Sequence, residues 1–291
     1  MERKKAVGQE PSLTVCNHDA GLTVLSDDET VGKVVAEEIL AVMEEALEAR
    51  GRFVLGCPGG RTPMSTYRAL GAEFRRRDTD LSQLVIVMMD DYVRATEAGW
   101  RHVDERAHYS CRRFAVDEIQ SVLNAGVSPA HALRDEYIYL PNPENPAAFE
   151  KLLARLGGVD FFILASGAGD GHVAFNPPGT PENARTRVVE LAQQTRIDNL
   201  ATFPDFGGIE EVPTHGVTVG TGTITEFSRK AAMIAIGPDK ANAVERMAAA
   251  RTYDPDWPAT VFRTIPGTRL YVDAAAAKGV VACDASERSV Q

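Results

Sequence analysis

The sequence predicts an α/β fold with an open, mostly parallel, doubly wound sheet and helices on both faces. Two observations support this prediction. Short apolar runs alternate along the chain with longer segments whose apolar residues recur at helical spacing. Runs such as Leu84–Met89 and Asp160–Ala165 are apolar at nearly every position, as expected for parallel strands covered on both faces. In such sheets, ligands bind beyond the carboxyl ends of the strands.

In the first half of the chain, the capping-box spacing of Ser26 and Glu29 predicts the start of a helix. Its apolar residues continue from Val31 to Arg50, and Gly51 is typical of a helix end. Thr62 and Pro63 are typical of the N-cap and first residue of a second helix. The other elements expected here are strands at Leu22–Leu25, Phe53–Leu55 and Leu84–Met89, and a helix around Glu105–Phe114.

In the second half, Asn145 and Pro146 predict the start of a helix that runs to Leu156. Residues 176–215 are rich in Pro, Gly, Asn and Asp, and we expect a long excursion with little regular structure. Strands are also expected at Tyr137–Leu140, Asp160–Ala165, Val217–Val219, Ala231–Ile236 and Arg269–Val272, and helices at Thr223–Ser228 and Pro238–Ala250. We expect one domain at residues 21–282, between a polar leader at 1–20 and a tail at 283–291.

The composition argues against several classes of function. The formal net charge of -10 disfavours binding to nucleic acid or anionic membranes, so an anionic substrate would need a local basic pocket. No apolar run approaches the roughly 18 residues of a membrane span, and Met1–Pro11 lacks the apolar region of a secretion signal. The four cysteines form no C-x-x-C pair, which favours reduced thiols and a cytoplasmic protein.

Two glycine-containing turns between a strand and a helix are candidate anion sites. The first consists of Gly59, Gly60, Arg61 and Thr62. Glycines let backbone N–H groups approach an anion, and a helix N-terminus adds positive potential, although a plain tight turn would have the same sequence. The second turn contains Lys240, whose charge is unfavourable in a first helical turn unless it holds an anion. An exposed surface lysine is the alternative.

Two further segments carry groups suited to proton transfer. Asp90 and Asp91 follow the strand at 84–89. The repulsion between two adjacent carboxylates costs free energy, which favours a functional role for them. A helix cap or a loop salt bridge is the alternative. Asp170 and His172 lie in a glycine-rich loop, where the aspartate can orient the imidazole and select its tautomer. The six histidines include no H-x-H or H-x-x-x-H pair and no cysteine lies near His172, so we expect no metal.

Taken in order, these segments resemble the superfamily of glucosamine-6-phosphate deaminases and 6-phosphogluconolactonases. Residues 59–64 resemble the deaminase Gly-Gly-Thr-Pro-Met motif, and Met89–Tyr92 resembles Met-Asp-Glu-Tyr. The stretch at 169–176 resembles the deaminase signature Asp-Gly-His-Ile-Ala-Phe-Asn-Glu up to its last residue, whereas lactonases usually continue Asp-Gly-His with Thr-Ala-Ser. The segments Val217–Gly220, Gly237–Lys240 and Trp257–Thr260 match as well, so the resemblance spans roughly residues 20–280 and favours the deaminase side.

The resemblance implies that Asp90 moves a proton between C1 and C2 of an open-chain sugar. It implies that His172, held by Asp170, opens the sugar ring, and that Lys240 and the turn at 59–62 hold the phosphate without any cofactor. Two positions depart from the deaminase pattern. The Glu expected after Asn176 is Pro177, and the phosphate-binding Arg aligns with Ala201. The candidates to replace that arginine are Arg61, Arg187 and Arg196.

The leading prediction is an isomerase or deaminase that acts on a phosphorylated (amino) sugar. The first alternative is hydrolysis of a sugar-phosphate lactone, in which His172 activates water and neither Asp90 nor a carboxylate at Pro177 is needed. The second alternative is a non-catalytic sugar-phosphate sensor, although residues 1–20 are too short for a helix-turn-helix. The expected partner is a small sugar phosphate, with no nucleic acid and no membrane, and a homo-oligomer is left open.

Overall fold

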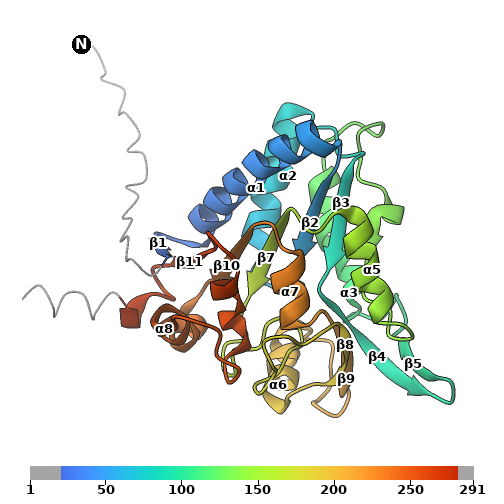
Figure 1. The fold of residues 1–291 in the computed structure, drawn as a ribbon, viewed down its shortest axis with the longest axis vertical. Coiled ribbons are helices and arrows are strands. Elements are labelled where there is room, and N and C mark those ends of the chain that lie inside the picture. The colour runs from blue at the N-terminus through green and yellow to red at the C-terminus, as the bar shows by residue number, and fades with distance from the viewer. Residues whose placement is uncertain (1–20, 281–291) are drawn as a thin grey trace, which may run out of the picture.

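The computed structural model describes residues 21–280, so the expected leader at 1–20 and tail at 283–291 lie outside the described part. Within residues 21–280 the central feature is a seven-stranded, all-parallel sheet with the order β1-β11-β10-β7-β2-β3-β6 (Figure 1). Its strands are β1 (Leu22–Leu25), β2 (Phe53–Cys57), β3 (Leu84–Met88), β6 (Ile138–Tyr139), β7 (Phe161–Ala165), β10 (Ala231–Ala235) and β11 (Arg269–Asp273).

Successive residues of these strands pack into two separate cores, one on each face of the sheet. In β2, Phe53 and Leu55 belong to the core beneath α1 (Asp28–Arg50) and α2 (Met64–Arg77). Val54, between them, belongs to the core on the other face. That second core is covered by α5 (Ala147–Leu156), α7 (Thr221–Phe227) and α8 (Ala241–Ala249) (Figure 1). The structure therefore confirms the prediction of a doubly wound parallel sheet.

A second, four-stranded antiparallel sheet lies at the carboxyl end of the first and was not predicted. Its order is β5-β4-β9-β8, with bounds Gly99–His102, Asp90–Thr96, His215–Thr218 and Arg187–Glu190. The chain passes from β3 almost directly into β4, so Asp90 begins a strand and pairs with Thr218 of β9. The strand expected at Val217–Val219 therefore belongs to this sheet and not to the parallel one.

Several helix starts differ from the sequence expectation. Asp27, not Ser26, caps α1, because its carboxylate accepts a hydrogen bond of 2.8 Å from the Thr30 N–H. Helix α2 begins one residue late, at Met64, and has no side-chain cap. The helix expected around 105–114 begins only at Cys111, where the Ser110 hydroxyl accepts from the Arg113 N–H. It is built from α3 (Cys111–Phe114), a π-helical stretch (Ala115–Gln120) and α4 (Ser121–Asn124).

The excursion at 176–215 contains more regular structure than expected. It holds β8 and a ten-residue helix, α6 (Gln193–Thr202), beside β8 and β9 (Figure 1). Short 3-10 helices lie at Asp135–Tyr137, Pro238–Lys240 and Pro258–Thr264. Of the helices in residues 21–280, none is both long and apolar enough to cross a membrane.

Candidate active site

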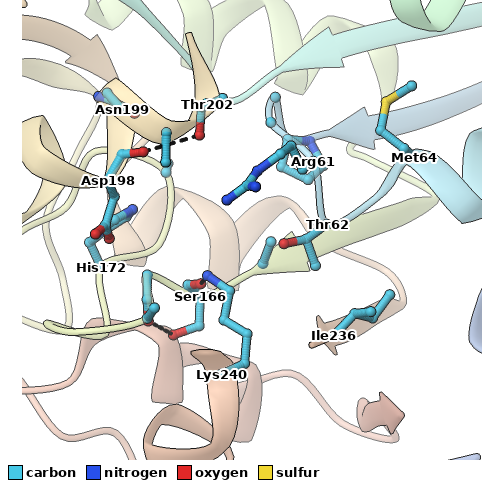
Figure 2. Close-up of a pocket in the computed structure, with 18 of the residues that line it drawn as sticks. Arg61, Thr62, Met64, Ser166, His172, Asp198, Asn199, Thr202, Ile236 and Lys240 are labelled. Atoms are coloured by element: carbon cyan, nitrogen blue, oxygen red, sulfur yellow. Dashed lines mark hydrogen bonds between the residues drawn. The ribbon is translucent and has the colours of Figure 1, made fainter. Parts of the chain in front are cut away.

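Four adjacent strands of the parallel sheet, β10, β7, β2 and β3, end at one edge, and each is followed by one of the predicted motifs. A cavity of about 650 Å³ opens at this edge. The predicted residues that line it are Gly59, Gly60, Arg61, Thr62, Asp90, His172 and Lys240. Figure 2 shows the Arg61 and Lys240 side chains directed toward this space, with His172 on its other side. The topology thus brings together groups that are up to 181 residues apart, from Gly59 to Lys240.

Asp170 and His172 form a hydrogen-bonded pair. His172 Nδ1 donates to Asp170 Oδ1 at 2.6 Å, since an ionised carboxylate only accepts. The Thr195 hydroxyl donates to Asp170 Oδ2 at 3.2 Å and lies 3.1 Å from His172 Nδ1. Burial acts to raise the pKa of Asp170, but the hydrogen bond and charge of His172 outweigh it and hold the pKa below its ordinary value. With Nδ1 occupied, Nε2 is the ring nitrogen left for proton exchange.

Two glycines make room for this pair. A Cβ at Gly167 would lie 2.3 Å from His172 Nδ1 and 2.5 Å from Asp170 Oδ1. Gly171 has a φ of +65°, and a Cβ there would lie 2.2 Å from the Trp257 ring. Both contacts are far too short for real atoms, so the loop keeps its shape only with glycine at these positions.

Asp90 is a buried carboxylate at the cavity wall. Asp90 is only 7% exposed, and this burial raises the pKa of its carboxyl group to about 7. The Cys111 thiol, with Sγ 3.6 Å from Oδ1, opposes the shift, and the charge of Asp91 adds to it. A carboxylate with a pKa near neutral is suited to take up and return a proton at physiological pH.

The cavity contains cationic side chains, although aspartates line it as well. The ammonium group of Lys240 donates to the Ser166 carbonyl at 2.9 Å, and its burial lowers the pKa of Lys240. Arg61 and Arg68 also line the cavity, and Arg68 lies on α2, where the sequence analysis did not expect a ligand. The Ser65 hydroxyl in the first turn of α2 is buried and has no hydrogen-bond partner among the described residues. These donors lie near the start of α2, and a helix N-terminus favours an anion.

The other two candidate arginines point elsewhere. The Arg196 guanidinium donates to the carbonyls of Ile209 and Val212 and does not line the cavity. Arg187 donates to the Asn176 side-chain oxygen at 2.9 Å and is likewise outside the cavity. Of the three arginines considered from sequence, only Arg61 is available to a ligand here.

A family model described as glucosamine-6-phosphate isomerases/6-phosphogluconolactonase matches residues 26–270. The chain belongs to this family. It is 33% identical over 258 residues to a glucosamine-6-phosphate deaminase of Mycolicibacterium smegmatis, covering 88% of this chain and 90% of the relative. It is 34% identical over 221 residues to the deaminase of Cutibacterium acnes, covering 76% and 77%.

Solved structures of this family agree with the fold. A glucosamine-6-phosphate deaminase described as monomeric is 25% identical, with a TM-score of 0.71 over 88% of this chain and 98% of that one. A 6-phosphogluconolactonase from Shewanella baltica is 15% identical, with a TM-score of 0.59 over 86% and 96%, which shows the shared fold. The matches confirm the predicted superfamily, and the chain is an enzyme on its deaminase side.

Helix α6 forms a part of the cavity wall that was not predicted from the sequence. Asp198, Asn199 and Thr202 line the cavity, together with Ala201, which the resemblance had already aligned with a phosphate-binding arginine. The spacing of Thr195, Asp198 and Thr202 repeats at i, i+3 and i+7, and this polar helical face was the available signal.

Among the described residues, one group of three has its potential metal-ligand atoms within 4.8 Å of one another: Asp170, His172 and Asp198. The 2.6 Å contact between Asp170 and His172 is a hydrogen bond that already occupies one atom of each. This geometry favours a proton-transfer site, and the prediction of a metal-independent enzyme remains to be tested.

Proposed function

We propose that this protein is a metal-independent sugar-phosphate deaminase or isomerase, with a phosphorylated amino sugar of the glucosamine-6-phosphate type as its substrate. The observation that carries the proposal is that Asp90 and His172 open onto the same cavity as Arg61 and Lys240. One end of the cavity therefore offers cations and backbone donors, and the wall offers a carboxylate and an imidazole. A sugar phosphate needs both kinds of group at once.

The site suggests a role for each residue. Lys240, Arg61 and the backbone of the turn at 59–62 bind the phosphate at the start of α2. His172, with Nδ1 fixed by Asp170, serves ring opening through Nε2. Asp90 then transfers a proton from C2 to C1 of the open-chain sugar as O1 is protonated. In an amino sugar this leaves an imine at C2, which a water molecule hydrolyses to the ketose phosphate and ammonia. The raised pKa of Asp90 suits both halves of this transfer.

Hydrolysis of a sugar-phosphate lactone is the second candidate. Pro177 favours it, because no carboxylate follows Asn176 and lactone hydrolysis requires only an activated water and a stabilised oxyanion. The lactonase structures are more distant than the deaminases, so this candidate ranks second. The sensor alternative is set aside because the relatives are named as enzymes. A cytoplasmic location and the absence of nucleic-acid and membrane partners belong to the same proposal.

A substrate panel separates the two candidates. Phosphorylated aldoses, phosphorylated amino sugars and a phosphorylated aldonolactone would be assayed for ammonia, ketose and acid release. We expect ammonia and a ketose phosphate from the amino sugar, and little turnover of the same sugar without phosphate. Acid release from the lactone, with no ammonia or ketose from any sugar, would contradict the proposal.

A further inference from the structure

Helix α6 places a second carboxylate beside His172. The ligating atoms of Asp198, His172 and Asp170 lie within 4.8 Å of one another, and Asp198 lines the cavity. In Figure 2 the Asp198 carboxylate lies next to the His172 ring, on the side of the cavity opposite Met64. No sequence motif pointed to Asp198, because it lies in a segment expected to be irregular.

One anchor of α6 is a contact with the Asp170–His172 pair itself. Thr195, one turn before Asp198, is 3% exposed and donates its hydroxyl to Asp170 Oδ2 at 3.2 Å. Asp198 Oδ1 accepts a hydrogen bond of 2.9 Å from the Gln194 amide on the same helix. Asp198 Oδ2 accepts no hydrogen bond from the residues that the structure describes, so its charge is available to the cavity.

The charged groups around His172 come from four elements. Asp170 lies on its own loop and binds Nδ1, Asp90 comes from β4, Asp198 from α6, and Lys240 from the 3-10 helix after β10. The charge of Asp198 also acts on Lys240, where it favours the ammonium form. Asp198 therefore acts on two groups, His172 and Lys240, that carry positive charge when protonated. The carboxylate that would follow Asn176 is absent, because residue 177 is proline.

We propose that Asp198 is a positioning residue for ring opening, which stabilises the protonated form of His172. This inference rests on the proposed function. In the step, Nε2 of neutral His172 accepts the proton of the sugar O1 hydroxyl. The C1–O1 bond becomes a carbonyl as the C1–O5 bond breaks, and the imidazolium returns the same proton to O5. The histidine is positively charged only between the two transfers, and that is the state in which a carboxylate nearby lowers the energy.

The test compares a ring-opening reaction with one that does not need ring opening. Three variants are used: Asp198→Asn keeps the size and the acceptor for Gln194, Asp198→Glu restores the charge, and Gln194→Ala removes only the supporting hydrogen bond. The first assay is kcat on the pyranose amino-sugar phosphate. The second is exchange of the C1 proton of the ketose phosphate with heavy water, which uses the open-chain ketone that forms spontaneously. Tm is measured for each variant.

We expect Asp198→Asn to lower kcat on the pyranose about 10-fold or more, short of the 10²–10⁴-fold typical of a general acid–base group itself. Exchange on the ketose, KM and Tm should stay near wild type, Asp198→Glu should recover part of kcat, and Gln194→Ala should have a small effect. A wild-type kcat for Asp198→Asn, or an equal loss in both assays, would overturn the inference alone. An absence of both reactions in the wild type would overturn the proposed function, and the inference with it.

Discussion

Asp90 and Asp91 are adjacent in the chain, but only Asp91 has its hydrogen bonds satisfied. The Asp91 carboxylate accepts from the N–H groups of Tyr92 and Cys111, each at 2.9 Å, and lies 2.9 Å from His102 Nδ1. Asp90 faces the cavity, and the only hydrogen bond of its carboxylate among the described residues is the 3.6 Å contact from the Cys111 thiol. Successive residues of β4 point to opposite faces, which separates a structural carboxylate from one available to a substrate.

This difference predicts opposite effects of two matched substitutions on stability. The pKa of Asp90 is raised from 3.8 to about 7, so the folded state binds its proton more tightly than the unfolded state does. The unfavourable contribution of Asp90 is therefore absent below pH 3.8, grows as the pH rises, and is complete above about pH 7. We expect Asp90→Asn to raise Tm by several degrees at about pH 8 and to change it little near pH 4.

Asp91→Asn is the control for this measurement. Asp91 is 1% exposed and its carboxylate contacts three neighbouring groups, so the substitution should lower Tm at both pH values. Thermal unfolding followed by circular dichroism measures both variants. A lower Tm for Asp90→Asn at about pH 8 would show that Asp90 is not a destabilising buried charge.

The sequence predicted the central sheet well because its strands are buried on both faces. In β3 all five residues are buried, so the strand appears as a continuous apolar run. The end of α1 was equally visible, since Gly51 has a φ of 64° that disfavours other residues. The candidate site followed from the same logic, because parallel strands carry their motifs to one edge.

The rest of the site was hidden because it is held by polar contacts. Of the ten residues of α6 only Thr195 is buried, so the helix has almost no apolar periodicity to detect. It is anchored by Thr195 at Asp170 and by Arg196 at the backbone of 209–212. The hairpin of β4 and β5 was missed for a similar reason, since its tip is exposed and charged.

The Asp170–His172 pair predicts a graded loss of activity. His172→Gln should remove most turnover while the fold stays intact, because a loop histidine contributes little to the core. Retention of more than about a tenth of the wild-type kcat/KM would contradict its assigned role, given the usual contribution of general acid–base groups. Asp170→Asn should also lower the rate, because an amide can present its NH₂ group to Nδ1 and release the tautomer that the carboxylate selects.

Gly167→Ala tests the same pair without removing either partner. Its Cβ would fall 2.3 Å from His172 Nδ1, so the pair must separate and kcat should fall. Gly169→Ala in the same loop is the matched control, because its Cβ meets only the flexible Gln194 side chain at 3.0 Å. Equal kcat values for the two variants would contradict this account of the loop.

Arg61 and Arg196 predict different outcomes of the same substitution. Arg61→Gln should raise KM for a phosphorylated substrate, with little effect on Tm, because the guanidinium faces the cavity. Arg196→Gln should lower Tm with little change in KM, because its guanidinium binds the carbonyls of Ile209 and Val212. Steady-state kinetics and thermal unfolding distinguish the two. A rise in KM for Arg196→Gln, with none for Arg61→Gln, would show that Arg196 and not Arg61 binds the phosphate.

The predicted independence from metal has a direct test at Asp170, His172 and Asp198. Exhaustive chelation followed by gel filtration should leave kcat unchanged, since the 2.6 Å hydrogen bond between Asp170 and His172 already occupies two of the potential ligand atoms. Metal analysis of the treated protein provides the control. Loss of activity that is restored only by a divalent cation would show that the three side chains form a metal site.

Exchange of the C2 proton with heavy water tests the central claim most directly. The wild-type enzyme, incubated with a phosphorylated amino sugar at about pH 8, should incorporate deuterium at C2 or C1 during turnover, as NMR would show. Asp90→Asn keeps the size of the side chain but removes the base, so exchange and ammonia release should fall together by about 10²–10⁴-fold. Asp91→Asn, where it remains folded, should retain exchange. Wild-type hydrolysis of a phosphorylated lactone, with no exchange on any phosphosugar, would contradict the claim that Asp90 is the base of a deaminase or isomerase.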